Sequence, residues 1–268
     1  MGDEARSVLI TGASAGIGRA CAEALHAAGW AVTGASRRGT APAGCTGLVM
    51  DVDDDESVRA GVAGLVAAGG QIDALVAAAG WGLAGAAEHS PVTDAMAQMD
   101  TNFWGCVRVV QQVLPAMRAR GGGRIVLVSS IGGLIGIPFQ AFYSATKFAL
   151  EGYGEALAYE VAPFGVQVTL VEPGNIKTDF TASRRMAAPD PDPVYGAAFT
   201  RALGVMERDE ANGAPAAEVA AVVRRVLDSS RPPRRVSAGK TTERMGLVAK
   251  RLLPFRLFQA GARGALGV

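Results

Sequence analysis

Short apolar runs alternate with segments of helical periodicity along most of the chain. The runs are continuous, which is typical of parallel strands that helices cover on both faces. They predict strands at 7–10, 31–35, 48–50, 74–78, 124–129, 167–171 and 235–237. Between them, apolar residues at helical spacing predict helices at 18–28, 55–68, 93–118, 142–162 and 216–228. This order favours a doubly wound α/β sheet, in which ligands bind at the carboxyl ends of the strands.

Two segments depart from this alternation. Prolines and aspartates interrupt residues 179–211, where we expect short helices at 180–186 and 194–206. Residues 240–268 mix Arg and Lys with Leu, Val and Phe, and predict a basic amphipathic helical tail. We favour a tail that packs on the domain or on a partner subunit. The alternative is a peripheral contact between this tail and a membrane surface.

Composition narrows the class of protein. The 268 residues are 49% hydrophobic, which suits one domain with a large core, and the net charge of +1 gives no reason to expect a nucleic-acid partner. The three cysteines are scattered, without the spacing of a disulfide framework or a zinc site, so we expect a cytoplasmic location and no metal. No apolar stretch reaches the ~18 residues that would predict a membrane-spanning helix.

A glycine-rich turn follows the first predicted strand. Gly12, Gly16 and Gly18 let the backbone turn tightly and approach a ligand closely, and the next helix offers free N–H groups to a pyrophosphate. The alternative is a tight strand-to-helix connection without a ligand. With the alternating elements, the turn predicts a single doubly wound Rossmann domain over residues 1–239. Its sheet would be seven-stranded and mostly parallel, with helices on both faces.

Tyr143 and Lys147 stand one helical turn apart in F-Y-S-A-T-K-F. A phenol has an ordinary pKa of about 10, and an ammonium group at i+4 on the same helix face favours the phenolate. The pair is therefore a candidate acid/base device. The alternative is an ordinary packed aromatic side chain beside a solvated lysine.

Five motifs together resemble the short-chain dehydrogenase/reductase family. They are T-G-A-S-A-G-I-G near the start, D-T-N-F-W-G around Asn102, V-S-S-I-G-G around Ser130, Y-S-A-T-K, and E-P-G-N-I-K-T at 172–178. They occur in the family's order and spacing, and the resemblance covers residues 7–239. The stretch from Leu134 to Gly152 looks most similar to the hydroxysteroid and retinol dehydrogenase branch.

The resemblance implies catalytic roles for four residues. Tyr143 would protonate a substrate carbonyl or deprotonate an alcohol, and Lys147 would lower the pKa of Tyr143 and bind the nicotinamide ribose. Ser130 would hold the substrate oxygen, and Asn102 would keep a helix locally open for a proton path through water. Two alternatives stay open, because Asn102 also suits the start of a helix and Ser129 adjoins Ser130.

The end of the second predicted strand indicates the cofactor. Ser36, followed by Arg37, stands where NAD-binding Rossmann domains carry an acidic residue for the ribose 2′-OH. A hydroxyl and a guanidinium suit a 2′-phosphate, so we expect NADP(H) rather than NAD(H), with Arg37 as the main determinant. The alternative is that Arg37 and Arg38 are simply solvated.

The resemblance places the other nucleotide contacts at strand ends. Ala77-Ala78-Ala79-Gly80 stands where relatives carry Asn-Asn-Ala-Gly, so two side-chain amides are missing here. Besides Tyr143 and Lys147, the predicted contacts are Gly12, Ser14, Gly16, Ile17, Gly18, Ser36, Arg37, Asp51, Val52, Ala78, Gly80, Pro173, Gly174, Ile176 and Thr178.

An apolar substrate wall completes the expected site. We expect it to include the insertion at 179–211, which covers the substrate in the family, although a surface excursion is the alternative. Its other members would be Leu134, Ile135, Ile137, Phe139 and Phe142. The sequence thus predicts an NADP(H)-dependent oxidoreductase that acts on a hydrophobic ketone or secondary alcohol, as a homo-oligomer. A non-catalytic dinucleotide-binding sensor or scaffold on the same fold is the alternative.

Overall fold

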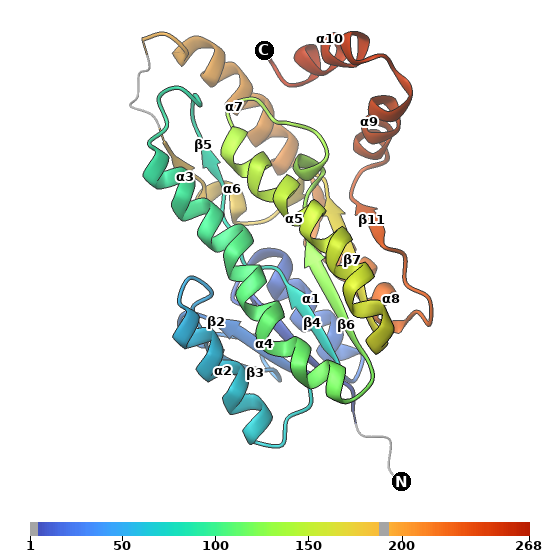
Figure 1. Ribbon diagram of the computed structural model, residues 1–268. Helices are drawn as coiled ribbons and strands as arrows, with labels where there is room; N and C mark the ends of the chain where they lie inside the picture. Colours follow the sequence, from blue (N-terminus) through green and yellow to red (C-terminus); the bar gives the residue numbers. More distant parts are fainter. Residues whose placement is uncertain (1–4, 188–192) are drawn as a thin grey trace.

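A seven-stranded parallel sheet forms the centre of the molecule (Figure 1). The computed structural model describes residues 5–187 and 193–268. The strand order is β11-β7-β6-β4-β1-β2-β3, and every pair in this sheet is parallel. The strands are β1 (Ser7–Thr11), β2 (Ala31–Ser36), β3 (Thr46–Val49), β4 (Ala74–Ala77), β6 (Gly123–Val128), β7 (Val166–Pro173) and β11 (Arg235–Ala238).

Helices cover both faces of the sheet, as predicted. One layer contains α1 (Gly16–Ala27) and α8 (Ala216–Asp228), and the other contains α2 (Asp55–Ala67), α4 (Gly105–Ala119) and α5 (Ala141–Val161). The apolar runs are continuous because successive side chains of a strand enter different cores. In β1, Leu9 belongs to one core, whereas Val8 and Ile10 belong to the other.

The predicted helix at 93–118 is not continuous. It consists of α3 (Val92–Met99), a π-helical turn η1 (Asp100–Trp104) and α4. The prediction of one α-helix was wrong here because apolar periodicity carries no signal for a single wide turn. Short 3₁₀ turns, η2 (Ile131–Gly133) and η3 (Ala162–Phe164), flank α5 in sequence.

The insertion at 179–211 forms mixed structure. It contains α6 (Phe180–Ser183), a strand β9 (Arg185–Met186) that pairs with β5 (Leu83–Ala84), and α7 (Gly196–Ala211). The expected helix at 180–186 was therefore wrong at its end, and the expected helix at 194–206 begins later and continues to Ala211. Beyond the insertion, β10 (Ala214–Pro215) pairs with β8 (Ile176–Lys177). The predicted break at 187–195 lies mostly outside the described residues.

The tail forms two helices instead of one, α9 (Thr241–Leu252) and α10 (Phe255–Ala265). Pro254 begins the second helix, since proline fits a helix start but not its interior. The Glu243 carboxylate accepts hydrogen bonds from the Asn175 backbone N–H at 3.0 Å and side-chain amide at 2.8 Å. Lys250 donates to the Leu134 carbonyl. The tail therefore packs on its own domain, and none of the described helices is long and apolar enough to cross a bilayer.

Candidate active site

One large cleft of about 880 Å³ lies at the carboxyl ends of the strands. In Figure 1, β4, β6 and β7 point towards the end of the molecule where α7, α9 and α10 lie. Every residue predicted to bind the dinucleotide or to act in catalysis lines this cleft. The strand ends therefore assemble the predicted set in one place, as a doubly wound sheet requires. The individual roles stay predictions.

The first part of the cleft is the turn between β1 and α1, which carries Gly12, Ser14, Gly16, Ile17 and Gly18. Gly12 and Gly16 have φ of 70° and 53°, in the region that favours glycine. A Cβ on Gly12 would lie 3.0 Å from the Ala79 backbone, and one on Gly18 would overlap the Gly12 carbonyl. A side chain would therefore clash at Gly18, crowd the backbone at Gly12, and strain the backbone at Gly12 and Gly16.

The N-terminus of α1 has the properties of an anion site. Its N-cap residue is Ala15, no side chain caps its N–H groups, and its first turn contains no acidic residue. These N–H groups face the cleft, where a pyrophosphate would accept their hydrogen bonds and benefit from the helix dipole. The residues present therefore fit a dinucleotide.

The alanine segment after β4 lacks the two asparagines of the family pattern, and the Thr11 side chain holds its backbone instead. Thr11 Oγ1 accepts hydrogen bonds from the backbone N–H groups of Ala78, at 3.1 Å, and Ala79, at 3.2 Å. The missing amides are thus not needed to fix this backbone, and the small side chains leave room for Gly12 to approach it. Sequence analysis did not single out Thr11.

The ends of β2 and β3 form the adenosine end of the cleft, with Ser36, Arg37, Asp51 and Val52. The Ser36 hydroxyl donates to the Thr40 carbonyl at 3.0 Å, which fixes the turn after β2. Within the described residues, Arg37 makes no hydrogen bond or ion pair, so its guanidinium is available to a ligand. No acidic side chain stands at the Ser36 position itself.

Asn102 is buried inside η1 and holds the connection after β4. Its Oδ1 accepts from the Trp81 N–H at 2.9 Å, while its Nδ2 donates to the Trp81 carbonyl at 3.0 Å and to Thr146 Oγ1 at 3.3 Å. Asn102 caps no helix, because α3 starts after Pro91 and α4 after Trp104. The alternative of a helix-start cap was therefore wrong. Asn102 instead joins the π-helical turn, the β4 connection and α5.

Tyr143 and Lys147 lie on one face of α5, both lining the cleft. The Lys147 Nζ donates to the Val128 carbonyl at 2.9 Å and lies 5.9 Å from the centroid of the Tyr143 ring. Burial lowers the pKa of Lys147 to about 8, although Cys106 and Glu151 act in the opposite direction.

The pKa of Tyr143 is raised, not lowered. Burial raises it, and the hydrogen bond with the Ser130 hydroxyl only partly opposes that shift. Lys147 is not among the groups that shift this pKa here, since its ammonium group donates to the Val128 carbonyl. The lowering of the Tyr143 pKa by Lys147 therefore stays a prediction.

Ser130, and not Ser129, is the serine that meets Tyr143. The Ser130 Oγ accepts the Gly132 N–H at 3.0 Å and donates to the Pro173 carbonyl at 3.5 Å, and Ser130 acts to lower the pKa of the Tyr143 phenol. The buried Ser129 hydroxyl has no hydrogen-bond partner among the described residues. The geometry thus agrees with the choice made from the spacing.

Pro173, Gly174, Ile176 and Thr178 follow β7 and line the same cleft. Beyond them, the apolar end contains Ile135, Ile137 and Phe180, and the Phe180 ring packs on Tyr143 with 5.9 Å between centroids. The other three wall residues were predicted wrongly, since Leu134, Phe139 and Phe142 lie outside the lining. Phe139 instead packs on Phe199, with ring centroids 5.4 Å apart.

Sequence analysis missed the part of the lining that comes from the tail. The inward face of α9 and α10 closes the apolar end of the cleft with glycines and with apolar side chains. They are Gly246, Ala249, Leu253, Leu257, Phe258, Gly261, Ala262, Ala265 and Leu266. Their spacing of three or four residues is a helical stripe, so the signal was present in the sequence. Trp81 and Gln140 were missed as well, and carry no comparable pattern.

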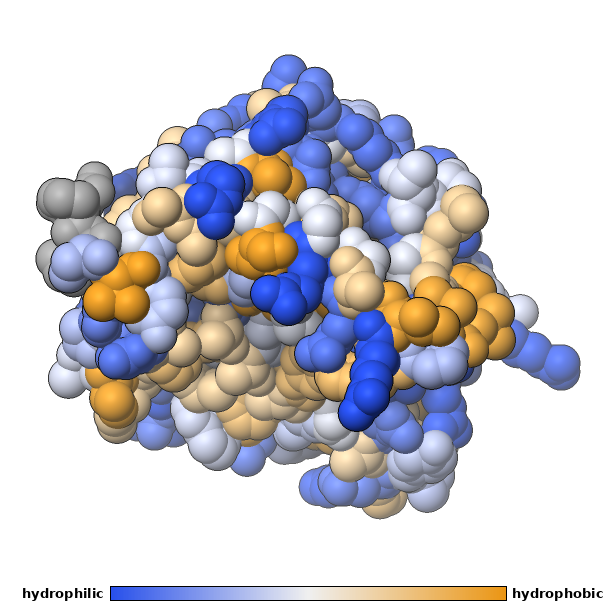
Figure 2. Space-filling view, turned by 90° about the horizontal axis from the view of Figure 1, so that it is seen from above, coloured by the Kyte–Doolittle hydropathy of each residue, from blue (hydrophilic) through white to orange (hydrophobic). Residues whose placement is uncertain are grey.

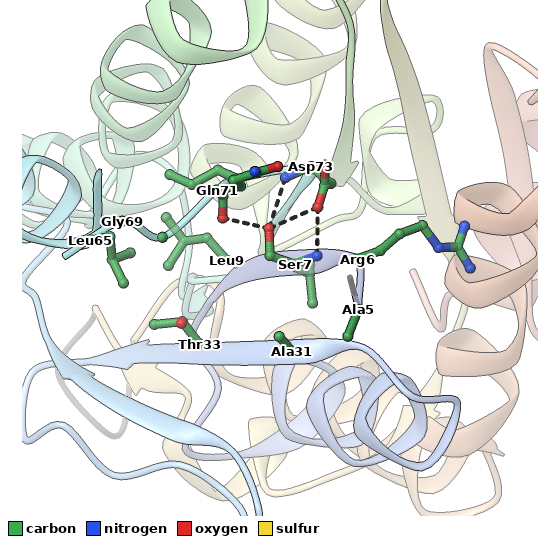
Figure 3. A pocket seen from close by; sticks show the side chains of 13 residues that line it. Ala5, Arg6, Ser7, Leu9, Ala31, Thr33, Leu65, Gly69, Gln71 and Asp73 are labelled. Atoms are coloured by element: carbon green, nitrogen blue, oxygen red, sulfur yellow. Dashed lines mark hydrogen bonds between the residues drawn. The ribbon is translucent and has the colours of Figure 1, made fainter. Parts of the chain in front are cut away.

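A second, smaller cavity lies at the opposite, amino ends of β1 and β2 (Figure 3). Here the Ser7 hydroxyl donates to the Gln71 carbonyl at 2.5 Å, and the Asp73 carboxylate accepts the Ser7 backbone N–H at 2.7 Å. Arg120 forms an ion pair with the same carboxylate. These polar groups satisfy one another and tie β1 to β4, so we assign the cavity a structural role.

Comparison with known proteins agrees with this geometry. The family model for short chain dehydrogenase matches residues 6–188. The chain is 39% identical over 258 residues to the 3-ketodihydrosphingosine reductase of Bacteroides thetaiotaomicron, covering 96% of both. It is 35% identical to retinol dehydrogenase 8 of Bos taurus, covering 88% of this chain and 82% of the relative. A short-chain dehydrogenase structure from Streptomyces avermitilis matches with a TM-score of 0.84 at 33% identity, covering 98% of this chain and 99% of the other.

Proposed function

Because the chain belongs to the short-chain dehydrogenase/reductase family, we propose that it is an NADP(H)-dependent oxidoreductase that interconverts a hydrophobic ketone and its secondary alcohol. One observation carries the proposal. The Tyr143 phenol and the Ser130 hydroxyl line the same cleft as the glycine-rich turn and the apolar residues, and Ser130 lies close enough to act on the pKa of the phenol. A sensor or scaffold that only binds a dinucleotide has no need for such a pair.

The chain's own groups suit ketone reduction. Burial raises the pKa of Tyr143, so its phenol is protonated at neutral pH and can give that proton to a carbonyl oxygen. Ser130 offers a second hydroxyl donor at the same oxygen, where negative charge develops as the carbonyl is reduced. Phe180 packs on the Tyr143 ring and keeps water away from it. Lys147 stays close to the phenol because the Val128 carbonyl holds its ammonium group.

The nucleotide end is built for a phosphate-rich ligand. The N-terminus of α1 would bind the pyrophosphate, and Arg37 with Ser36 would bind a 2′-phosphate. A bound nicotinamide supplies or accepts the hydride, which no side chain of this protein can do. Preference for NADP(H) depends on Arg37, whose guanidinium has no partner within the described residues.

We propose a long-chain lipid ketone as the substrate class, like the one in the name of the Bacteroides thetaiotaomicron relative. Similarity to that relative extends over 96% of this chain, so it includes at least part of the tail. The tail helices extend the apolar end of the cleft beyond Phe180, which gives an alkyl chain a lining to contact. We further propose the cytoplasmic location and the homo-oligomeric assembly that the sequence suggests, the latter to be tested by light scattering.

The test is NADPH consumption with steroid, retinoid, aromatic and long-chain aliphatic ketones, including 3-ketodihydrosphingosine. We expect turnover with at least one of them, and a Tyr143→Phe variant that still binds NADPH but turns over none. NADPH binding without turnover of any ketone or alcohol in the panel would favour the sensor or scaffold. Turnover of steroids in preference to every long-chain ketone would refute the lipid substrate while leaving the reaction class intact.

A further inference from the structure

The tail helices have an outward face that differs in character from the face that closes the cleft. Met245, Val248 and Leu252 recur every three or four residues on α9 and so form one stripe, and Phe255 follows as the first residue of α10. Their side chains are 65%, 54%, 76% and 68% exposed. Each is large and apolar, and none is needed to line the cleft. We call these four residues the outer stripe.

A second stripe of α9 faces the cleft, and each of its residues follows a residue of the outer stripe by one position in the sequence. Gly246, Ala249 and Leu253 line the apolar end of the cleft. Three hydrogen bonds hold α9 in this orientation, two from Asn175 to the Glu243 carboxylate and one from Lys250 to the Leu134 carbonyl. The outer stripe therefore cannot turn inwards without opening the substrate end of the site.

Basic residues alternate in sequence with the residues of the outer stripe and follow them along α10. The segment from Arg244 to Val268 contains five Arg and Lys residues and no Asp or Glu, whereas the net charge of the whole chain is only +1. Lys250 is directed at Leu134 and the Phe148 ring. The other four, Arg244, Arg251, Arg256 and Arg263, are exposed and make no ion pair with the described residues. Figure 2, which looks onto the end of the molecule where α7 and α10 lie, shows hydrophobic groups beside strongly hydrophilic ones.

We propose that the outward face of α9 and α10 binds the surface of an anionic lipid bilayer. An exposed apolar stripe flanked by arginines fits this partner, because the apolar side chains enter the acyl boundary while the guanidinium groups contact anionic headgroups. A second copy of the chain fits less well, since a twofold contact would bring the same arginines face to face. The acyl region of the bilayer complements the apolar stripe, and its anionic headgroups complement the positive charge of the tail.

Docking in this way places the substrate end of the cleft at the membrane, because both stripes belong to the same short helices. This consequence depends on the proposed function, in which the substrate is a lipophilic ketone. Such a substrate would pass from the bilayer to the cleft beside α9 and α10 without crossing water. The docking itself requires no turnover and can be tested apart from it.

The test is co-sedimentation of the full-length protein with vesicles of phosphatidylcholine alone or mixed with phosphatidylserine. We expect binding to the anionic vesicles only, weakening as salt is added. In the apolar variant, Met245, Val248, Leu252 and Phe255 are all changed to Ser, and we expect binding about tenfold weaker or lost. Circular dichroism and NADPH turnover with a soluble ketone would show that the variant is folded and active.

A charge variant and a matched control complete the design. Arg251→Glu with Arg256→Glu should also weaken binding about tenfold or more. Arg224→Glu with Arg231→Glu makes the same change in net charge at exposed arginines outside the tail, and should leave most of the binding intact. The proposal would be overturned if both pairs of substitutions weakened vesicle binding equally. It would also be overturned if the wild type bound neutral and anionic vesicles equally, or bound neither. A tail-dependent change in mass by light scattering without vesicle binding would overturn it as well, and would identify a second copy as the partner.

Discussion

The buried ammonium group of Lys147 should lower the stability of the folded protein more at neutral pH than at high pH. Lys147 is only 6% exposed, and burial lowers its pKa from 10.5 to about 8. A lowered pKa in the folded state means that folding disfavours the charged form. The penalty is therefore largest below pH 8 and fades as the pH rises towards 10.5, where the unfolded chain also loses the proton.

The magnitude follows from the two pKa values. The difference between the two pKa values corresponds to about 3 kcal/mol of the free energy of unfolding at pH 7, and to about 1 kcal/mol at pH 9.5. Lys147→Met keeps an unbranched side chain of similar length and removes the charge. It also leaves the Val128 carbonyl without its donor, a loss of about 1–3 kcal/mol that does not depend on pH. The two effects nearly cancel at pH 7, so the pH dependence is the informative quantity.

The assay is urea unfolding of the wild type and Lys147→Met at pH 7 and pH 9.5. We expect the stability of the variant relative to the wild type to fall by about 2 kcal/mol between these pH values. Lys177→Met, at an exposed lysine of β8, serves as the control and should show no such change. If the free energy of unfolding differs between Lys147→Met and the wild type by the same amount at both pH values, the reasoning is refuted. The same variant should lose NADPH turnover, which would show that the site carries a destabilising group because the reaction needs it.

Four further changes test separate parts of the structure. Arg37→Ala should raise the KM for NADPH far more than the KM for NADH, and equal effects would refute the cofactor assignment. Tyr143→Phe should reduce kcat by about 10²–10⁴-fold while the Kd for NADPH, measured by fluorescence, stays nearly the same. Asn102→Ala should lower the free energy of unfolding by about 1–3 kcal/mol and lower kcat, measured by urea unfolding and steady-state kinetics. Burial acts to raise the pKa of Asp73, but hydrogen bonds from Arg120 and Ser7 lower it overall. The stabilisation of the protein by the Asp73 carboxylate is therefore present above pH 4 and lost as the pH falls below that. Asp73→Asn should therefore destabilise the protein by about 1–3 kcal/mol at pH 7, and urea unfolding should show the deficit shrinking towards pH 3.

The sheet could be predicted from the sequence almost completely. A strand buried on both faces is a continuous apolar run, and each of the seven runs contributes a strand of the sheet within two residues of its predicted ends. The dinucleotide end of the cleft followed from the same pattern. Gly12, Ser36 and Asp51 come directly after or at the end of such runs, and parallel strands bring their carboxyl ends together.

The substrate end was harder to predict because no strand fixes it. Its residues come from the η2 region, the insertion and the tail, which are joined by contacts between distant parts of the chain. Phe139 and Ile137 are two positions apart, yet Ile137 lines the cleft while Phe139, with φ of 58°, turns towards Phe199. A backbone conformation of this kind is unusual for a residue with a side chain, and local periodicity gives no sign of it.

The π-helical turn shows a second limit of sequence patterns. A widened turn in place of a regular one has no periodicity of its own, so the pattern over 93–118 reads as one helix. The reason for the turn lies in Asn102, whose amide bonds to both backbone groups of Trp81 and to Thr146 on α5. Only the resemblance to a family pointed to this residue, whereas its spacing alone was equally consistent with a helix cap.

Glu243 gives Gly174 a reason to be glycine besides its predicted contact with the dinucleotide. A Cβ on Gly174 would overlap the Glu243 carboxylate, which also accepts from the backbone and side chain of Asn175. The loop after β7 therefore holds the start of α9 as well as lining the nucleotide end. Because α9 in turn lines the substrate end and carries the outer stripe, a displacement of this helix would be felt by the loop at Gly174. The same contact thus links the surface that we assign to the membrane with the part of the cleft that we assign to the cofactor.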